Sequence, residues 1–203
     1  MTKRVLDFVG ASMGIVLLSP LLAAISVALL VFLGRPVLFR QVRPGLHGHP
    51  FTLYKFRTMQ MAESPDTPQG DAERLTKFGR WLRNTSLDEL PELWNVVRGD
   101  MSMVGPRPLL TEYLPLYTAA QARRHEVRPG ITGWAQVQGR NLLPWEEKFE
   151  NDVWYVDNLS IWLDVRILGM TFGRVLEREG VNQQGEATVE RFRGSVRESG
   201  RVQ

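Results

Sequence analysis

The chain has 203 residues, a formal net charge of +3 at pH 7 and no cysteine. This length is enough for one hydrophobic core plus an anchor. The lack of cysteine excludes disulfide bonds, thiolate metal sites and cysteine nucleophiles. The basic balance favours anionic partners such as acidic lipid, phosphate or nucleic acid.

An apolar stretch without a charged residue, Phe8–Gly34, dominates the N-terminal part of the chain. As a helix it would be about 40 Å long, against a hydrocarbon core of about 30 Å. Basic residues lie on both sides of it, Lys3 and Arg4 before it and Arg35 after it. Flanking Lys and Arg favour the cytoplasmic side, so a straight span would send one basic flank across the membrane.

Ser19 and Pro20 lie near the middle of this stretch. Pro20 removes a helical hydrogen bond and its ring clashes with the carbonyl of Val16, which predicts a kink. The Ser19 hydroxyl can bond back to the carbonyl of Ile15. Each arm would be only about 20 Å long, too short to span alone. We therefore predict a re-entrant helix-break-helix with both ends cytoplasmic; a kinked spanning helix is the alternative.

Two short strands follow, over 37–41 and 51–56, separated by Gly- and Pro-containing turns. Alternation along the second strand places Lys55 and Arg57 on the same face. The simplest interpretation is that this face is solvated and lies beside anionic lipid. A helix is predicted over 72–84 from the spacing of its apolar residues, with Arg83 near its end.

Asp88 and Glu89 are adjacent carboxylates ahead of another apolar helical pattern. Ser86 and Glu89 have the spacing of a capping box, and Asp88 could itself be the N-cap, so both acids have a purely structural interpretation. They also have a chemical one. A carboxylate can attack phosphorus as a nucleophile, and a second can help to hold Mg²⁺ beside a phosphate.

Arg107 lies between Pro106 and Pro108. Two prolines stiffen the backbone on either side, so the guanidinium is presented with little entropy left to lose. Arginine binds phosphate bidentately. A rigid turn with an incidental arginine is the alternative.

The stretch 109–127 is predicted to be helical, and a glycine-rich segment follows it. That segment carries Trp134, Gln136 and Arg140, residue types that suit a sugar or nucleotide diphosphate. Two helices are predicted over 146–179, with an apolar stripe that could lie in the headgroup plane or face the core. Trp145, Trp154, Tyr155 and Trp162 are aromatic residues of the kind enriched at membrane interfaces.

Taken together, these motifs resemble the small, monotopic bacterial phosphoglycosyl transferases that charge a polyprenyl-phosphate carrier. The resemblance extends from about Lys3 to Phe192 and is carried by Ser19-Pro20, 54–59, 86–90, 98–108, 128–132 and 133–141. It continues through Gly180-Val181 and Thr188–Phe192 as in members that transfer N,N′-diacetylbacillosamine phosphate. Pro91 and Asn182–Glu186 depart from the family pattern, and the latter leaves the exact sugar open.

The resemblance implies a two-step reaction at the cytoplasmic face of a bacterial inner membrane. Asp88 would attack the sugar-linked phosphorus of a UDP-sugar and release UMP, and undecaprenyl phosphate would then take the sugar phosphate from Asp88. Glu89 would hold Mg²⁺, while Arg83, Arg107 and Arg140 would contact phosphate, with Lys55 as a further cation. The product would begin glycoconjugate assembly, such as protein glycosylation, and could pass to a downstream glycosyltransferase.

The sequence thus predicts an α+β, mainly helical fold with a small β-hairpin and amphipathic interfacial helices. The expected divisions are a membrane anchor over 1–35, a catalytic domain over 36–190 and a polar tail over 191–203. The other candidate function is that of a membrane-tethered protein binding anionic lipid or nucleic acid, although no nucleic-acid motif is present. An alcohol phosphotransferase acting on CDP-lipids would need several spanning helices. The sequence does not fix the oligomeric state.

Overall fold

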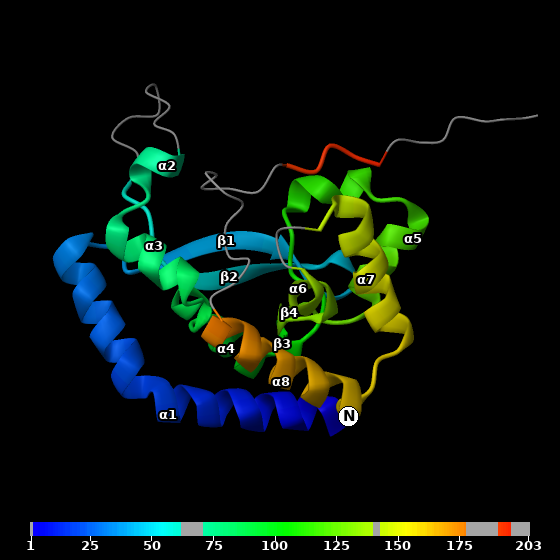
Figure 1. Ribbon diagram of the computed structural model, residues 1–203, viewed down its shortest axis with the longest axis horizontal. Coiled ribbons are helices and arrows are strands. Elements are labelled where there is room, and N and C mark those ends of the chain that lie inside the picture. The colour runs from blue at the N-terminus through cyan, green and yellow to red at the C-terminus, as the bar shows by residue number, and fades with distance from the viewer. Residues whose placement is uncertain (1, 62–70, 140–142, 178–190, 196–203) are drawn as a thin grey trace, which may run out of the picture.

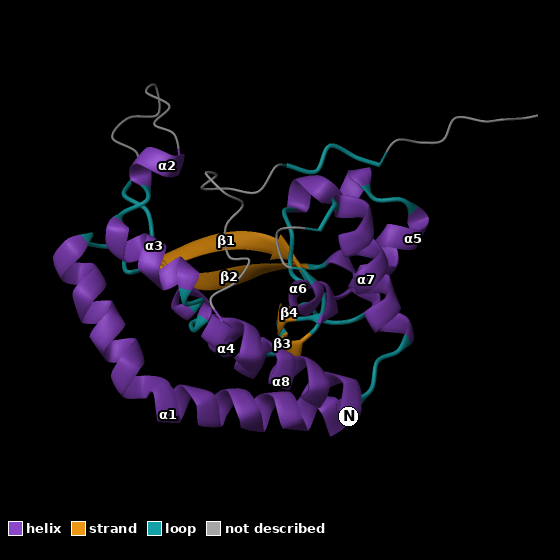
Figure 2. Cartoon of the chain, viewed as in Figure 1, coloured by secondary structure: helices purple, strands orange, loops and turns teal. Residues whose placement is uncertain are grey.

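The computed structural model describes residues 2–61, 71–139, 143–177 and 191–195 (Figures 1 and 2). Its α-helices are α1 Thr2–Phe32, α2 Asp71–Arg74, α3 Lys77–Asn84, α4 Glu92–Arg98, α5 Ala119–Ala122, α6 Trp134–Gln138, α7 Trp145–Asp157 and α8 Ile161–Glu177. Its strands are β1 Leu38–Pro44, β2 Pro50–Phe56, β3 Ser102–Val104 and β4 Gly130–Thr132. The short 3₁₀ helices are η1 Leu46–Gly48, η2 Leu87–Glu89, η3 Thr111–Leu116 and η4 Arg123–Glu126. The predicted α+β, mainly helical fold is confirmed.

Helix α1 runs along one side of the molecule and changes direction part-way along its length (Figure 1). The helix continues through Pro20, so the proline bends it rather than interrupting it. The Ser19 hydroxyl donates to the carbonyl of Val16 at 2.8 Å, one residue away from the acceptor expected at Ile15. By length and composition α1 is sufficient to cross a membrane, and only 11% of its most apolar stretch is buried by the rest of the protein.

The predicted hairpin is confirmed as the antiparallel pair β1–β2, with a register from Leu38 opposite Phe56 to Pro44 opposite Pro50. Helix α4 packs against it through Asn95, which is fully buried. The side-chain amide of Asn95 donates to the Thr52 carbonyl at 2.7 Å, and its oxygen accepts from the Tyr54 amide at 3.1 Å. Since a buried polar group needs such partners, these bonds fix α4 beside β2.

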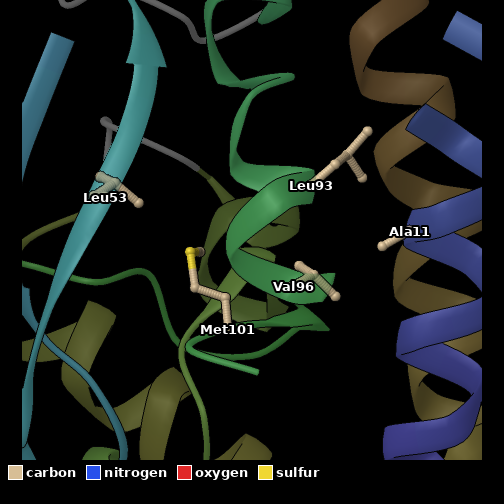
Figure 3. Close-up of a cluster of buried hydrophobic side chains, with 5 residues drawn as sticks. All are labelled: Ala11, Leu53, Leu93, Val96 and Met101. Carbon is tan, nitrogen blue, oxygen red and sulfur yellow. The ribbon is translucent and has the colours of Figure 1, made fainter. Parts of the chain in front are cut away.

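A hydrophobic cluster joins α1 to the rest of the molecule. Ala11 of α1 faces Leu93 and Val96 of α4, and Leu53 of β2 and Met101 complete the cluster (Figure 3). Small residues on α1 allow this close approach, because a Cβ atom on Gly14 would already touch the Leu93 side chain at 3.5 Å. Helix α4 is therefore packed between the hairpin and α1.

A second, parallel pair of strands, β3 and β4, was not predicted. Each strand has only three residues, too few for a period-two pattern to be recognised in the sequence. The chain segments come so close that a Cβ atom on Gly105 would overlap the backbone of Arg128, and one on Gly130 would overlap that of Gly105. These glycines hold the segment that follows β3 against the start of β4.

Two predicted helices are shorter than expected. The stretch 72–84 is divided into α2 and α3, because Leu75 forms a β-bridge with Met59 and Thr76 caps α3 by accepting from the Gly79 amide at 3.0 Å. The stretch 109–127 contains η3, α5 and η4 in place of one helix, with Pro115 inside η3. The two C-terminal helices are confirmed as α7 and α8.

The predicted interfacial aromatic residues have different environments. Trp162 on α8 is 78% exposed, and Phe172 on the same helix is 70% exposed, so α8 presents a large apolar surface. Tyr155 is buried in the core, and Trp145 packs edge-on against Tyr113 in an aromatic cluster. Trp154 remains partly exposed.

Part of the predicted tail is described, and it lies against the body of the protein. Phe192 is buried in the aromatic cluster with Tyr113 and Phe149, and the Tyr113 hydroxyl accepts from the Phe192 amide at 3.2 Å. The predicted divisions at residues 35 and 190 stay predictions.

Candidate active site

Asp88 and Glu89 lie in η2, a single turn between α3 and α4. Ser86 precedes the turn with a left-handed φ of 55°, and its side chain caps nothing. Pro91 takes the N-cap position of α4, again without a side-chain cap. Both structural interpretations, the capping box and the Asp88 N-cap, are therefore wrong, and neither carboxylate is used to satisfy the helix.

Glu89 instead accepts from two cations contributed by distant segments. Lys55 Nζ of β2 lies 2.7 Å and Arg107 Nη2 lies 2.6 Å from the same oxygen, Oε1. Burial alone would raise the pKa of Glu89, but Arg107 and Lys55 outweigh it and hold that pKa far below its usual range. Lys55 therefore lies in an ion-pair cluster, and the expected solvated strand face is wrong.

Arg57, the other basic residue of that face, is also buried and has a structural role. Its guanidinium donates to the carbonyls of Leu33 and Gly34, at 2.5 and 2.7 Å, and to that of Arg35 at 3.4 Å. These carbonyls follow the end of α1, where a helix leaves acceptors without intrahelical partners. Arg57 thus ties the C-terminal end of α1 to β2.

Glu92 is a third carboxylate in the cluster, and sequence reasoning missed it. It is 2% exposed, and its Oε1 lies 3.0 Å from Lys55 Nζ. Burial raises the pKa of Glu92 to about 7, with Glu89 adding to the effect and Lys55 opposing it. Burial also acts to lower the pKa of Lys55, but Glu89 and Glu92 reverse this and raise it, so the ammonium stays charged. The sequence feature that could have identified Glu92 is its spacing, because it follows Glu89 by about one helical turn.

Asp88 is 8% exposed and has no side-chain hydrogen bond among those described for it. Burial and then the charge of Glu89 raise the pKa of Asp88 to about 6, against the opposing effect of Lys55, Arg107 and Arg83. Arg83, at the end of α3, donates from Nε to the Thr58 hydroxyl at 2.9 Å. Arg83 thus lies close enough for its positive charge to act against the raised pKa of Asp88.

Trp134 and Gln136 lie on α6. Trp134 stacks on Trp154 of α7 at a ring distance of 4.8 Å, and the guanidinium carbon of Arg166 of α8 lies 6.0 Å from its ring. The Gln136 amide approaches the Ile131 carbonyl of β4 at 3.5 Å. None of the contacts described for these two residues is with Glu89. Arg140 lies outside the described residues.

His125 does not add a positive charge to the cluster. Burial and the neighbouring Arg124 lower the pKa of His125 to about 4, so its ring is neutral at physiological pH. Within the described parts of the chain, no three His, Cys, Asp or Glu side chains are grouped as a ready-made metal site.

The assembled site combines carboxylates with cations in a largely buried setting. Its Lys–Glu–Arg contacts connect β2, η2 and the segment after β3, which no single sequence motif unites. Phosphoryl transfer depends chiefly on positioning and charge neutralisation, and buried cations held beside carboxylates are suited to both. Asp88 is the carboxylate in the cluster whose oxygens are not engaged by a described hydrogen bond or ion pair.

Comparison with known proteins agrees with this chemistry. Residues 1–178 match the family described as Bacterial sugar transferase. The chain is 55% identical over 194 residues to a Bacillus subtilis (strain 168) protein named "Uncharacterized sugar transferase EpsL", covering 95% of this chain and 96% of that protein.

Two further relatives carry the name UDP-glucose:undecaprenyl-phosphate glucose-1-phosphate transferase. The one from Caulobacter vibrioides is 42% identical over 186 residues, covering 86% of this chain and 69% of the relative. The one from Klebsiella pneumoniae is 41% identical over 181 residues, covering 83% of this chain and 39% of the relative, so this chain spans well under half of that longer protein. These names support the general reaction but not a bacillosamine derivative as the sugar. The matches confirm the predicted enzyme class, a phosphoglycosyl transferase, and the chain belongs to the bacterial sugar transferase family.

Proposed function

We propose that this enzyme transfers a sugar 1-phosphate from a UDP-sugar to undecaprenyl phosphate through a covalent intermediate on Asp88. In the first step an Asp88 oxygen bonds to the sugar-linked phosphorus, and the bond from that phosphorus to the UMP oxygen breaks. In the second step a phosphate oxygen of the lipid carrier bonds to the same phosphorus, and the bond to Asp88 breaks. The products are UMP and the lipid diphosphosugar, and Asp88 is regenerated as a carboxylate.

The observation that carries this proposal is the contrast between two neighbouring carboxylates. Glu89 is held by Lys55 and Arg107, whereas Asp88 is neither a helix cap nor a member of a described ion pair. With its pKa raised to about 6, Asp88 is more basic than an ordinary aspartate and is still mainly ionised at pH 7 to 8. An ionised carboxylate beside cations is the form that attacks phosphorus.

Mg²⁺ is the metal that fits the donor set. Mg²⁺ is commonly bound by one or two carboxylates together with substrate phosphate oxygens, and Glu89 would supply such a carboxylate next to Asp88 without a closed protein cage. When bound, the ion would supply charge neutralisation for the diphosphate. Arg107 and Lys55 would bind the substrate phosphates as they exchange contacts with Glu89, and Arg83 and Arg140 would add positive charge.

We further propose that α1 enters and leaves the membrane on the cytoplasmic side, so that the protein is monotopic. At the N-terminal end Lys3 Nζ contacts an Asp164 oxygen at 2.5 Å, and the Asp7 carboxylate accepts from the Met103 amide at 3.0 Å. At the other end Arg57 holds the carbonyls that follow the helix. Because both ends are bound to the same catalytic body, a spanning α1 would require one set of these contacts to break.

Two different observations bear on the identity of the sugar. The resemblance at the C-terminal motif favours an N-acetylated amino sugar such as N,N′-diacetylbacillosamine, whereas the relatives' names point to glucose. The divergent stretch that leaves the sugar open, 182–186, lies outside the described part of the chain. An assay with a panel of donors is therefore needed to identify the substrate.

The deciding experiment measures UMP release by detergent-purified protein with Mg²⁺, undecaprenyl phosphate and a panel of UDP-sugars that includes UDP-glucose and UDP-acetamido sugars. Release from one sugar, lost with EDTA and in Asp88→Asn, is the expected result. Asp157→Asn is the matched control, because Asp157 is an exposed helix residue paired with Arg123. Trapping of radiolabelled sugar phosphate on the wild type but not on Asp88→Asn would identify the intermediate. Near-normal turnover by folded Asp88→Asn would refute the nucleophile assignment.

A further inference from the structure

The segment Pro106–Pro108 is held by all three of its backbone carbonyls, each from a different element. The first accepts from the Gly130 amide of β4 at 3.0 Å. The second, that of Arg107, accepts from Arg124 Nη2 of η4 at 2.7 Å. The third accepts a longer contact from Arg43 Nη1 of β1 at 3.4 Å. The loop that presents the catalytic guanidinium is thus fixed from outside as well as by its prolines.

The hydrogen bond from Arg124 restrains the ψ angle of Arg107, which the flanking prolines do not fix. Proline fixes its own φ, and the residue before a proline is restricted to extended conformations over a broad range of ψ. The direction of the Arg107 carbonyl follows the ψ angle of Arg107. A donor on that carbonyl therefore sets the orientation of the peptide next to the side chain that reaches Glu89.

Arg124 is itself held in a buried site. Arg124 is 2% and Asp152 of α7 is 3% exposed, and one Asp152 oxygen accepts from Arg124 Nε at 3.0 Å and Nη2 at 2.7 Å. The rings of Tyr117 and Phe149 lie 5.8 and 5.7 Å from the guanidinium carbon. Since a buried arginine with these partners has little freedom to move, its bond to Arg107 is a rigid support.

We propose that Arg124, held by Asp152, is a positioning residue that orients Arg107 for phosphate binding. The inference rests on the proposed function, because it assigns Arg124 an effect only through Arg107. Arg124 contacts the loop through the Arg107 carbonyl, and no described ion pair joins it to Lys55, Glu89 or Glu92. Its charge is neutralised by Asp152, so what it contributes to the site is the geometry of the Arg107 peptide.

The variant to test removes both buried charges together, as Arg124→Met with Asp152→Leu. Removing one partner alone would leave an uncompensated buried charge and could unfold the protein, whereas an apolar pair of similar volume is tolerated far better. The matched control is Arg123→Gln with Asp157→Asn. Arg123 and Asp157 connect the same two elements, η4 and α7, but they are exposed and do not contact Arg107. The folded fraction is measured by thermal unfolding for each protein.

We expect the charge-free pair to lower kcat/KM for UMP release by about 10- to 100-fold, as misplacement of a positioning group by about 1 Å can do. The control pair should remain within about twofold of wild type, since it removes only an exposed ion pair. In an Arg107→Ala background, adding Arg124→Met and Asp152→Leu should lower kcat/KM by less than about a further twofold, because the side chain that Arg124 positions is gone. The loss in kcat/KM should also divide between kcat and KM in the same way as the loss caused by Arg107→Ala.

Three results would overturn the inference. The first is full kcat/KM in the Arg124→Met, Asp152→Leu variant at an unchanged folded fraction. The second is a loss that is the same with and without Arg107, which would indicate a general structural effect and leave the proposed function intact. The third is full activity of Arg107→Ala itself, which would refute the phosphate role of Arg107 and the positioning role together. Sensitive detection with radiolabelled UDP-sugar keeps the impaired Arg107→Ala background measurable.

Discussion

Nη2 of Arg107 lies 2.6 Å from Oε1 of Glu89. The two residues belong to separate sequence motifs, since Glu89 precedes α4 in the chain and Arg107 follows β3. Glu89 also raises the pKa of Arg107 above its usual range, so the guanidinium remains charged. The pair neutralises two buried charges. Under the proposed function, a substrate diphosphate would take over the guanidinium and leave Glu89 able to hold Mg²⁺.

Arg107→Ala tests this exchange. We expect a loss of transition-state stabilisation of about 3–4 kcal/mol, the size found for removal of other charge-stabilising donors, measured as kcat/KM for UMP release. Glu89→Gln should also reduce turnover severely while the protein remains folded, and it should weaken the Mg²⁺ dependence. Arg98→Ala is a suitable control, because Arg98 is half-exposed and pairs with Asp100 outside the cluster. Unchanged kinetics in Arg107→Ala would leave the arginine with a turn-stiffening role only.

Glu92→Gln tests the electrostatics of the cluster through stability. The pKa of Glu92 is raised from its usual 4.5 to about 7, so between these values the folded protein binds a proton that the unfolded chain has released. The free energy of unfolding of the wild type should therefore fall as the pH rises from about 4.5 to about 7, and it should level off above that.

The Gln variant lacks this titration. Its free energy of unfolding, relative to wild type, should rise by about 1–3 kcal/mol across the same pH window. Denaturant unfolding in detergent at pH 5 and pH 8 measures the difference, with Glu126→Gln as an exposed control. A constant difference between Glu92→Gln and wild type at the two pH values would show that Glu92 does not titrate in this window.

Arg57→Met tests the attachment at the C-terminal end of α1. The substitution keeps much of the buried apolar stem but leaves the carbonyls of Leu33 and Gly34 without their charged donor. We expect a loss of about 1–3 kcal/mol in the free energy of unfolding, the cost of leaving buried polar groups unpaired. Arg40→Met, an exposed change on the same hairpin, should cost less than about 0.5 kcal/mol. Equal effects of the two substitutions would argue against the attachment.

The proposed topology predicts the accessibility of both ends of α1. The natural chain lacks cysteine, so Thr2→Cys and Pro36→Cys each introduce a unique thiol. In intact cells neither thiol should react with a membrane-impermeant maleimide, and both should react after the membrane is permeabilised. A cysteine placed in a periplasmic loop of an unrelated membrane protein serves as the positive control. Labelling at residue 2 in intact cells would establish a spanning helix and exclude the re-entrant arrangement.

The elements with strong local signals could be predicted from the amino-acid sequence. The hairpin follows from alternation and turn residues, and α7 and α8 follow from helical spacing over many turns. The long apolar α1 with Pro20 was evident for the same reason, because every residue of such a stretch contributes to one pattern. The carboxylates Asp88 and Glu89 and the stiffened Arg107 could also be selected, since their residue types and spacing are chemically unusual.

Which of these residues lie in contact follows from the folded structure. The sequence could not show that Lys55 and Arg107 converge on one oxygen of Glu89, because these contacts join segments far apart in the chain. Glu92 and Asp152 were not selected from the sequence, because only burial among particular neighbours distinguishes them from other carboxylates. The short strands β3 and β4 likewise lack local periodicity and form because Gly105 and Gly130 allow two backbones to approach. Patterns along the chain report local conformation and residue chemistry, whereas ion pairing and desolvation depend on distances that only folding sets.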